Sequence, residues 1–437
     1  MNQFTASLWG DEAFSAILSQ KSIPQIIAII ARDTSPPLYN ICEHLLFRFF
    51  GSSEIAIRAL SFAFFILAIF FVYKIGENLW SRKTGAIAAI LTFFNPFFFT
   101  YAFEGRMYSL LALTVTSSFY FFLSRRWKLY VLTTAAALYT HHFAVFAILP
   151  QGLWFLKEYF FCKKKVAIQI LKSFIAIAIL YLPWVMPLLN QAKMVGTGFW
   201  LGTPTLTDFR SLVYKYLAEG IPHKLAQPAL YLVLAAFVIK RWGKDVEKNL
   251  FLVFWFLVPI IAVWVISQKY QAIFFDRYML YTIPAAMLLI ASGLRKISLP
   301  ILAGVIALFI IIDSFYFTHP TKRPFRELAA YVTESKRGDD YLINWNSAAH
   351  HLWESKYYGI PAPIYLSGDK LPYYVGTALM TEADTVSSLP QGKNARSINR
   401  IGVITSGPVE EVKLPGYTKN EVKQFGSLKF LWYLRIR

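Results

Sequence analysis

The chain has 437 residues, of which 56% are hydrophobic and only 16% are charged, and its mean hydropathy is +0.44. Soluble domains carry about 25% charged residues, so this composition excludes an ordinary soluble enzyme and also a disordered, collagen-like or disulfide-rich chain. The 44 basic residues exceed the 25 acidic ones, for a net charge of +19, but many of them stand in short tracts between apolar segments. The composition therefore predicts a polytopic helical membrane protein that does not bind nucleic acid. An anionic lipid or a lipid phosphate fits the charge as a partner.

The N-terminal segment, residues 1–56, combines acidic motifs with two stretches of helical pattern. A helix is expected over about 12–31, and the Pro-Pro pair at 36–37 forces a turn before an amphipathic helix over 38–50 that suits the membrane interface. We expect this segment to be an extracytoplasmic loop. A loop that carries chemistry normally follows a translocating helix, and no apolar span precedes Trp9. Either a first transmembrane helix is missing from this sequence or the segment crosses without one, and we expect the former.

Residues 57–318 are dominated by apolar segments of the length that spans a bilayer. About ten such segments can be distinguished, which predicts a transmembrane domain of about ten helices. They lie at 57–75, 85–103, 107–123, 129–140, 143–156, 166–189, 228–240, 249–267, 278–294 and 299–317. The fourth and fifth of these could instead form one long bent helix.

The connectors between these segments alternate between rich and poor in Lys and Arg. Basic residues gather at 74–83, 125–128, 157–165, 240–248 and 295–296. The positive-inside rule places these connectors in the cytoplasm, so the alternate connectors, residues 1–56 and the C-terminal tail are expected outside it. Cys42 and Cys162 then lie on opposite sides of the membrane and are not expected to form a disulfide.

The tail, residues 319–437, has a mixed polar composition with more Gly and Pro. Alternating helical and strand patterns predict a small α/β domain, which the topology places outside the cytoplasm. The expected helices cover 325–336 and 347–358, and the expected strands cover 340–345, 400–404 and 428–436.

Acidic residues open the first loop and are its candidate catalytic groups. Asp11 and Glu12 stand at the start of a helix and Asp33 stands before the Pro-Pro turn, so capping alone could explain all three. A carboxylate near an outer membrane surface can also act as a general base on a hydroxyl group or hold a cation. Asp11 and Asp33 are the candidate ligands if a divalent metal ion is used.

Three further polar clusters occur at outward helix ends. Glu104 and Arg106 stand in a very short turn before Tyr108, His141 and His142 end another helix, and Arg277 follows Asp276 at the start of a late span. Ionisable residues near a membrane are costly and are candidates for function, although each cluster alone could be a structural pair or an interfacial anchor. All the polar clusters are expected on one side of the membrane, and together they predict one cavity lined by carboxylates and cations.

These motifs resemble those of the GT-C superfamily of membrane glycosyltransferases, in particular the branch of bacterial enzymes that are similar to protein-O-mannosyltransferases and aminoarabinose transferases. The resemblance is specific over about residues 1–110, looser to about 280 and weak in the tail. It rests on Trp9-x-Asp11-Glu12-Ala13, Asp33-x-x-Pro36-Pro37-Leu38-Tyr39, Gly51-x-Ser53-Glu54, Arg58-x-x-Ser61, Glu104-x-Arg106-Met107-Tyr108 and Asp276-Arg277-Tyr278.

The resemblance implies a GT-C-like fold and an inverting transfer of sugar from a polyprenyl-phosphate-linked donor. The acceptor would be a hydroxyl group of a glycolipid, a polysaccharide or a protein at the outer face of a prokaryotic inner membrane. Asp11 matches the position of the acidic residue that is thought to be catalytic in this branch. The candidate site residues are Asp11, Glu12 and Asp33 for catalysis, Glu104, Arg106, Tyr108, His141 and Arg277 for the donor, and Trp9 and Tyr39 for the acceptor.

Three other classes of protein are compatible with parts of the sequence. A transporter or flippase of lipid-linked sugars would carry ionisable residues deep in broken helices, whereas these motifs lie at one surface. A polysaccharide polymerase or ligase would use the same lipid donors. A sensor or anchor would leave the outer polar clusters without a role.

Overall fold

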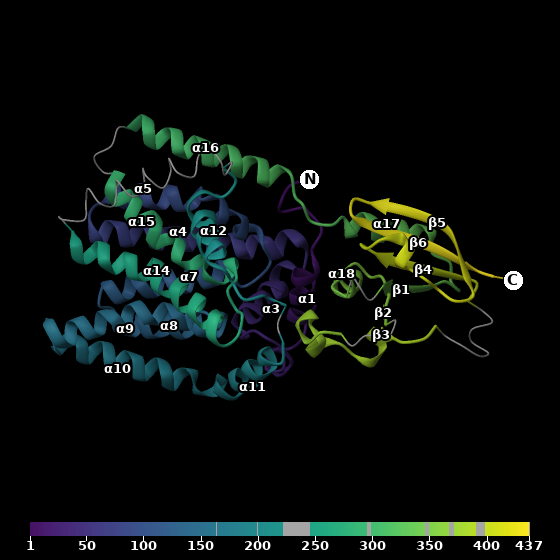
Figure 1. The fold of residues 1–437 in the computed structure, drawn as a ribbon, viewed down its shortest axis with the longest axis horizontal. Coiled ribbons are helices and arrows are strands. Elements are labelled where there is room, and N and C mark those ends of the chain that lie inside the picture. The colour runs from purple at the N-terminus through teal and green to yellow at the C-terminus, as the bar shows by residue number, and fades with distance from the viewer. Residues whose placement is uncertain are drawn as a thin grey trace. The chain divides into compact units, whose positions relative to one another are not determined.

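The computed structural model describes residues 1–162, 164–198, 200–221, 245–294, 299–345, 349–366, 371–389 and 398–436. The chain divides into two compact units. The sheet unit consists of Met1–Asp33, Asn40–Ile57 and His319–Arg437, and the helical unit consists of Thr34–Tyr39 and Arg58–Thr318. The sheet unit therefore combines the two ends of the chain (Figure 1).

The helical unit contains segments that are long and apolar enough to cross a membrane. Within the described residues, four segments meet this criterion on their own: Glu54–Leu79 (α4), Lys164–Gly196, Val246–Lys269 (α14) and Asp276–Leu294. An integral membrane protein with a mostly helical fold is thus confirmed. The expected span at 228–240 lies outside the described residues.

The expected apolar segment at 85–103 is broken into two helical pieces. Helix α5 (Arg82–Phe93) and the segment Pro96–Phe103, which contains α6 (Pro96–Thr100) and a 3₁₀ turn, are bent by 60° at their junction. Pro96 has no backbone N–H to continue α5, and the Asn95 side chain instead accepts a hydrogen bond of 3.0 Å from the Phe98 N–H. The Asn-Pro pair therefore ends one helix and starts the next.

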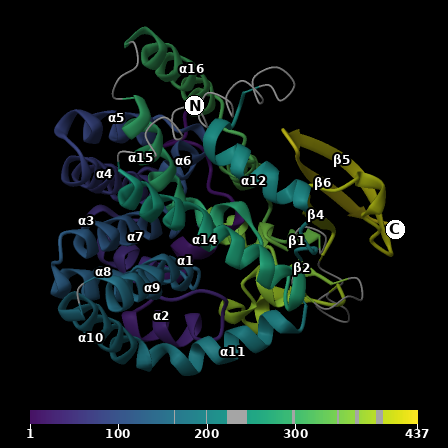
Figure 2. The same cartoon turned by 60° about the vertical axis from the view of Figure 1, so that its left-hand side comes forward.

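Most of the remaining helices of this unit are shorter. They are α7 (Tyr108–Leu123), α8 (Trp127–Thr140), α9 (Ala144–Phe161), α10 (Lys164–Tyr181), η2 (Leu182–Trp184), α11 (Val185–Gly196), α12 (Leu206–Ala218), η3 (Asp276–Thr282), α15 (Ile283–Leu294) and α16 (Leu299–Thr318). Helices α8 and α9 are two helices, not one long bent helix, because extended backbone at His141 ends α8. Helix α8 packs against α7 and α10, and α14 packs against α9 (Figure 2).

The N-terminal part of the sheet unit contains α1 (Gly10–Ser19), α2 (Ile23–Ile30) and most of α3 (Leu38–Phe50). The expected single helix over 12–31 is broken between Ser19 and Ile23. Pro24 stands in the first turn of α2, where its missing N–H costs nothing, and Ser22 provides the cap. The helix over 38–50 is confirmed.

The C-terminal part of the sheet unit is a six-stranded sheet with the order β3-β2-β1-β4-β6-β5. Strands β1 to β4 pair in parallel, and β6 pairs antiparallel with β4 and β5. The strands are β1 (Tyr341–Trp345), β2 (Ile364–Tyr365), β3 (Thr385–Val386), β4 (Arg400–Thr405), β5 (Tyr417–Phe425) and β6 (Leu428–Arg435). The helices are α17 (Phe325–Ser335) and α18 (His351–Tyr357), with 3₁₀ turns at Tyr373–Val375, Thr377–Leu379, Glu382–Asp384 and Val409–Glu411.

Side chains alternate between the two faces of this sheet. Leu342, Phe430 and Trp432 pack under α17, and the neighbouring Ile343 and Leu431 belong to a separate apolar cluster. The small C-terminal α/β region is therefore confirmed, and so are its three expected strands and the helix over 325–336. Strand β5 was not expected, because its residues are mostly polar and exposed.

Candidate active site

One group of candidate residues lies at the start of α1 in the sheet unit. Glu12 is completely buried, accepts a hydrogen bond of 3.3 Å from the Trp9 N–H and forms an ion pair of 2.7 Å with Lys322. Asp11 is only partly buried, and so is Trp9. Of the two adjacent carboxylates, Glu12 therefore caps the helix and compensates Lys322, while Asp11 keeps part of its surface exposed.

Helix α18 packs against α1 and brings a third carboxyl group to Asp11 and Glu12. Glu354 on α18 is 1% exposed. Burial raises the pKa of Glu354 well above its usual range; Asp11 and Glu12 raise it further, and Arg323 opposes the shift. Glu354 is a functional candidate that sequence reasoning missed, since nothing in the sequence connects it to a motif that lies more than 300 residues earlier.

The close packing of α1 and α18 depends on a glycine. A Cβ atom at Gly10 would lie 2.8 Å from the Cβ of His350, and Phe14 packs edge-on against Trp353 with ring centroids 5.3 Å apart. His351, which follows His350 in the sequence, is fully buried. Its Nε2 lies 3.0 Å from Arg323 Nη1. Burial lowers the pKa of His351 to about 3, so the neutral ring accepts the hydrogen bond from the guanidinium group.

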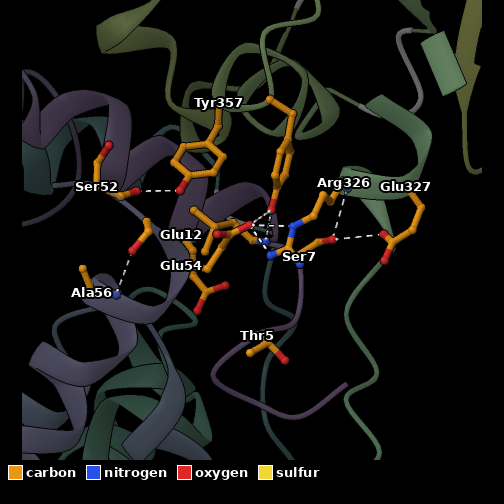
Figure 3. A network of polar contacts seen from close by, with 12 residues as sticks. Thr5, Ser7, Glu12, Ser52, Glu54, Ala56, Arg326, Glu327 and Tyr357 are labelled. Atoms are coloured by element: carbon orange, nitrogen blue, oxygen red, sulfur yellow. Dashed lines mark hydrogen bonds and ion pairs between the residues drawn. The ribbon is translucent and has the colours of Figure 1, made fainter. Parts of the chain in front are cut away.

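A second network ties the N-terminal segment to α17 and α18 within the sheet unit (Figure 3). Arg326 forms an ion pair with Glu54, which also accepts a hydrogen bond of 2.9 Å from the Tyr358 hydroxyl. The Tyr357 hydroxyl donates to the Ser52 carbonyl at 2.6 Å. The motif residue Glu54 is thus held by the C-terminal part of the chain.

Asp33 is placed differently from expectation. Helix α3 begins at Leu38, so Asp33 is not the N-cap that explained it from sequence. It is 7% exposed and stands in the turn after α2, where its N–H donates to the Ile30 carbonyl at 3.0 Å. Within the described ranges, no group of three His, Cys, Asp or Glu side chains is arranged to hold a metal ion.

A separate group of candidate residues, built around Arg277, lies in the helical unit. Its guanidinium lies 3.8 Å from a carboxylate oxygen of Glu104, and both side chains are about one-sixth exposed. The same guanidinium lies over the rings of Tyr108, at 5.5 Å, and Phe275, at 4.8 Å. The fold thereby brings residues from three predicted clusters together, because the His141 ring lies 5.0 Å from that of Tyr278.

His141 is a neutral hydrogen-bond donor in this cluster. Burial lowers its pKa to about 3, and His142, Arg106 and Arg277 lower it further. The Phe143 N–H lies 3.1 Å from His141 Nδ1. Since Nδ1 accepts this bond, the proton of the neutral ring resides on Nε2, which can donate to an oxygen atom.

Lys215 on α12 adds a cation that the sequence analysis did not single out. Its Nζ lies 2.7 Å from Asp276 Oδ2, and the other oxygen of Asp276 accepts a hydrogen bond of 2.7 Å from the Arg277 N–H. The Tyr216 hydroxyl donates to the Asp276 carbonyl. The Thr205–Asp208 capping box that starts α12 was a usable sequence signal for this helix.

Tyr39, expected near the acceptor, is 2% exposed, and its hydroxyl lies 3.4 Å from Ser61 Oγ. Gln191 on α11 donates to the Ser35 carbonyl at 3.3 Å and lies 2.7 Å from His142 Nε2. The Pro-Pro turn is therefore packed into the helical unit, while the acidic residues on its N-terminal side belong to the sheet unit.

Comparisons with known proteins agree with this architecture. Residues 34–189 match the family model described as dolichyl-phosphate-mannose-protein mannosyltransferase. The chain superposes on ArnT from Cupriavidus metallidurans in the apo state with a TM-score of 0.66 at 12% identity, covering 98% of this chain and 94% of ArnT. The chain has the fold of a GT-C glycosyltransferase. No curated protein sequence matches it significantly.

Two further solved structures share this GT-C fold. ArnT from the same organism bound to undecaprenyl phosphate gives a TM-score of 0.65 at 12% identity, with 98% of this chain and 94% of ArnT covered. The arabinofuranosyltransferase AftD from Mycobacteria gives 0.51 at 12% identity, with 98% of this chain but only 39% of AftD covered. The predicted enzyme class, a membrane glycosyltransferase, is confirmed by the family model and this fold together. The segment 34–189 includes Glu104, Arg106, Tyr108 and His141.

Proposed function

We propose that the chain is an inverting glycosyltransferase that moves a sugar from a polyprenyl-phosphate-linked donor to a hydroxyl group of an acceptor. The observation that carries this proposal is the cluster around Arg277, where cations, a neutral histidine and aromatic rings from distant segments meet. The structure of ArnT bound to undecaprenyl phosphate supports a lipid phosphate as the donor's leaving group.

The donor's phosphate is proposed to bind Arg277 and Arg106, with His141 Nε2 as a third donor. A guanidinium group offers two parallel N–H groups to phosphate oxygens. Arg277 is held by Glu104 on one side and by the Tyr108 and Phe275 rings on others, so it is oriented before the substrate arrives. Glu104 and Tyr108 thus serve the donor through Arg277.

Asp11 is proposed as the general base. The acceptor oxygen attacks the anomeric carbon from the face opposite the phosphate, the bond between that carbon and the phosphate oxygen breaks, and the hydroxyl proton passes to the Asp11 carboxylate. The polyprenyl phosphate leaves with the bonding electrons, and the anomeric configuration inverts. Glu12 and Asp33 are proposed to support this base, and the partly buried ring of Trp9 is proposed to stack on a sugar.

The proposed location is a prokaryotic inner membrane with the reaction on its outer face. Basic tracts at one set of connectors support this orientation. The acceptor belongs to one of three classes, namely a glycolipid, a polysaccharide or a protein.

The proposal is tested by incubating membranes that contain the chain with candidate polyprenyl-phosphate sugars and analysing the products by mass spectrometry. We expect a sugar-modified acceptor and free polyprenyl phosphate, both strongly reduced with the Arg277→Ala variant. Translocation of an intact lipid-linked sugar across proteoliposomes, without any transfer, would instead identify a flippase. Release of a lengthened lipid-linked glycan would identify a polymerase.

A further inference from the structure

A groove at one end of the helical unit has no role in the proposed reaction. It has a volume of about 500 Å³ and is lined by Arg125, Trp127, Lys164, Lys165, Val166 and Gln169. These residues come from the turn between α7 and α8 and from the first turns of α10. Helix α7 runs from Tyr108 to Leu123 and is 16 residues long, so the groove lies about 24 Å from the Tyr108 end of that helix.

The charges of this groove are uncompensated within the described part of the chain. Its lining has three cations and no carboxylate. Some other basic residues of the helical unit are paired, as Lys74 is with Glu77, Lys157 with Glu247 and Lys248 with Asp245. None of the ion pairs between described residues includes Arg125, Lys164 or Lys165. Like charges that line one groove repel each other, and an anion would remove this cost.

The backbone at Arg125 is strained for its residue type. Arg125 has a φ angle of 54°, and no other non-glycine residue in the described ranges has a positive φ. Its N–H and that of Arg126 close the end of α7 through bonds to Phe122 and Phe121, at 3.1 and 2.9 Å. Glycine is the favoured residue for such a helix end, and a side chain there costs about 1 kcal/mol. The sequence therefore keeps a guanidinium group at the rim of the groove against a local conformational cost.

Apolar side chains continue from the groove along the two helices that form it. Leu129 and Leu132 on α8 are exposed, and so are Ile168 and Leu171 on α10. Helices α8 and α10 pack against each other and run side by side in both views (Figures 1 and 2). A half-buried tryptophan, Trp127, stands between the charged and the apolar parts, as is common at a membrane interface.

We propose that this groove binds the headgroup of an anionic phospholipid, whose acyl chains lie along Leu129, Leu132, Ile168 and Leu171. The cations can bind the phosphate, the tryptophan can lie at the membrane interface and the exposed apolar side chains can contact the acyl chains. These groups follow one another in this order along the helices. A free anion would use only the cations and would not contact these apolar side chains. The proposal does not depend on the proposed transferase activity.

The test uses the full chain purified in detergent and probed by native mass spectrometry with phosphatidylglycerol and phosphatidylcholine. The triple variant Arg125→Gln, Lys164→Gln, Lys165→Gln should lose phosphatidylglycerol affinity by about tenfold or more, which is about 1.4 kcal/mol. The matched control is Arg126→Gln, Lys128→Gln, Lys172→Gln, which removes three cations from the same region without touching the groove. It should change the affinity less than twofold.

Three outcomes would overturn the proposal. An equal loss in the control would show that general positive charge attracts the lipid. Equal affinity for phosphatidylcholine would show that the charge of the lipid is irrelevant. Displacement of the lipid by inorganic phosphate at the same concentration would show a site for a soluble anion. If the triple variant does not fold, Arg125→Gly replaces it. Glycine relieves the backbone strain, so this variant should unfold at the same or a higher temperature and still bind less phosphatidylglycerol.

Discussion

The acidic residues at the start of α1 and the cluster around Arg277 differ in how their charges are compensated. Glu12 is completely buried and forms an ion pair of 2.7 Å with Lys322. The guanidinium of Arg277 lies 3.8 Å from a carboxylate oxygen of Glu104 and also lies over aromatic rings, so this ion pair is looser than that of Glu12. We therefore expect the close Glu12–Lys322 pair to hold the structure and the looser Arg277–Glu104 pair to rearrange when a ligand binds.

Substitutions of the adjacent residues Asp11 and Glu12 test most directly whether one carboxylate serves catalysis and the other stability. We expect Asp11→Asn to lower kcat by about 10²–10⁴, because a lost general base commonly costs this much, and to leave the unfolding temperature unchanged. Glu12→Gln should instead lower the unfolding temperature through loss of the Lys322 ion pair. Rates with a polyprenyl-phosphate sugar and thermal unfolding of both variants check the contrast. Near-normal turnover by a folded Asp11→Asn enzyme would pass the role of base to Asp33 or Glu104.

Removing Lys322, the ion-pair partner of Glu12, tests whether this pair stabilises the fold. Lys322→Met leaves a buried carboxylate without its cation, and breaking a buried pair in this way costs about 3–5 kcal/mol. We expect a large fall in the free energy of unfolding, measured by denaturant or heat. The double variant Lys322→Met, Glu12→Gln should recover a substantial part of that loss. If the single variant is as stable as the parent chain, Glu12 does not depend on Lys322.

Substitutions of Arg277 test whether the cluster around this residue binds the donor. Arg277→Ala should weaken donor binding by about 10- to 100-fold, because a hydrogen bond to a charged group is worth about 1.5–3 kcal/mol. Arg277→Lys keeps the charge but loses the planar fork, and should recover only part of the affinity. Binding of a polyprenyl-phosphate probe and of the acceptor should be measured separately. The assignment fails if donor affinity is unchanged or if acceptor affinity falls equally.

Features of the fold and of the candidate site could be predicted from the sequence where their pattern is local. Apolar segments identified the helical membrane fold, and alternation over 340–345, 400–404 and 428–436 identified three strands of the sheet. Polar signals near helix ends identified Glu104, Arg106, His141 and Arg277, and the fold brings Arg277 into contact with Glu104 and Tyr108.

Long-range partners could not be predicted in this way. Glu354 stands in an expected helix, but only the packing of α18 on α1 buries it beside the first acidic motif. Lys322 and Arg326 are ordinary basic residues in the sequence, and their ion pairs with Glu12 and Glu54 join segments about 300 residues apart. The bend between α5 and α6 had a local signal in Asn95-Pro96, which the high apolar content of the segment concealed.

Glu354 gives the smallest and most specific expected effect. Its pKa is raised in the folded chain by burial and by Asp11 and Glu12, against the opposing effect of Arg323. Between the unfolded pKa of about 4.3 and the raised folded pKa, the folded state binds more protons than the unfolded state. Stability therefore falls as the pH rises through this window. Glutamine resembles the protonated side chain, so Glu354→Gln should remove this pH dependence.

The measurement is the unfolding temperature of the full chain between pH 5 and pH 8. At pH 5 the parent and Glu354→Gln should be nearly equal, while at pH 8 the variant should be higher by a few degrees, since about 1 kcal/mol shifts Tm by roughly 2–4 °C in domains of 150–250 residues. The exposed Glu382 provides the control, because Glu382→Gln removes the same charge from the same unit without a buried group and should leave the pH slope unchanged. A Glu354→Gln chain that keeps the parent's pH slope would show that Glu354 is ionised where it is buried, and that Arg323 outweighs the desolvation of its carboxyl group.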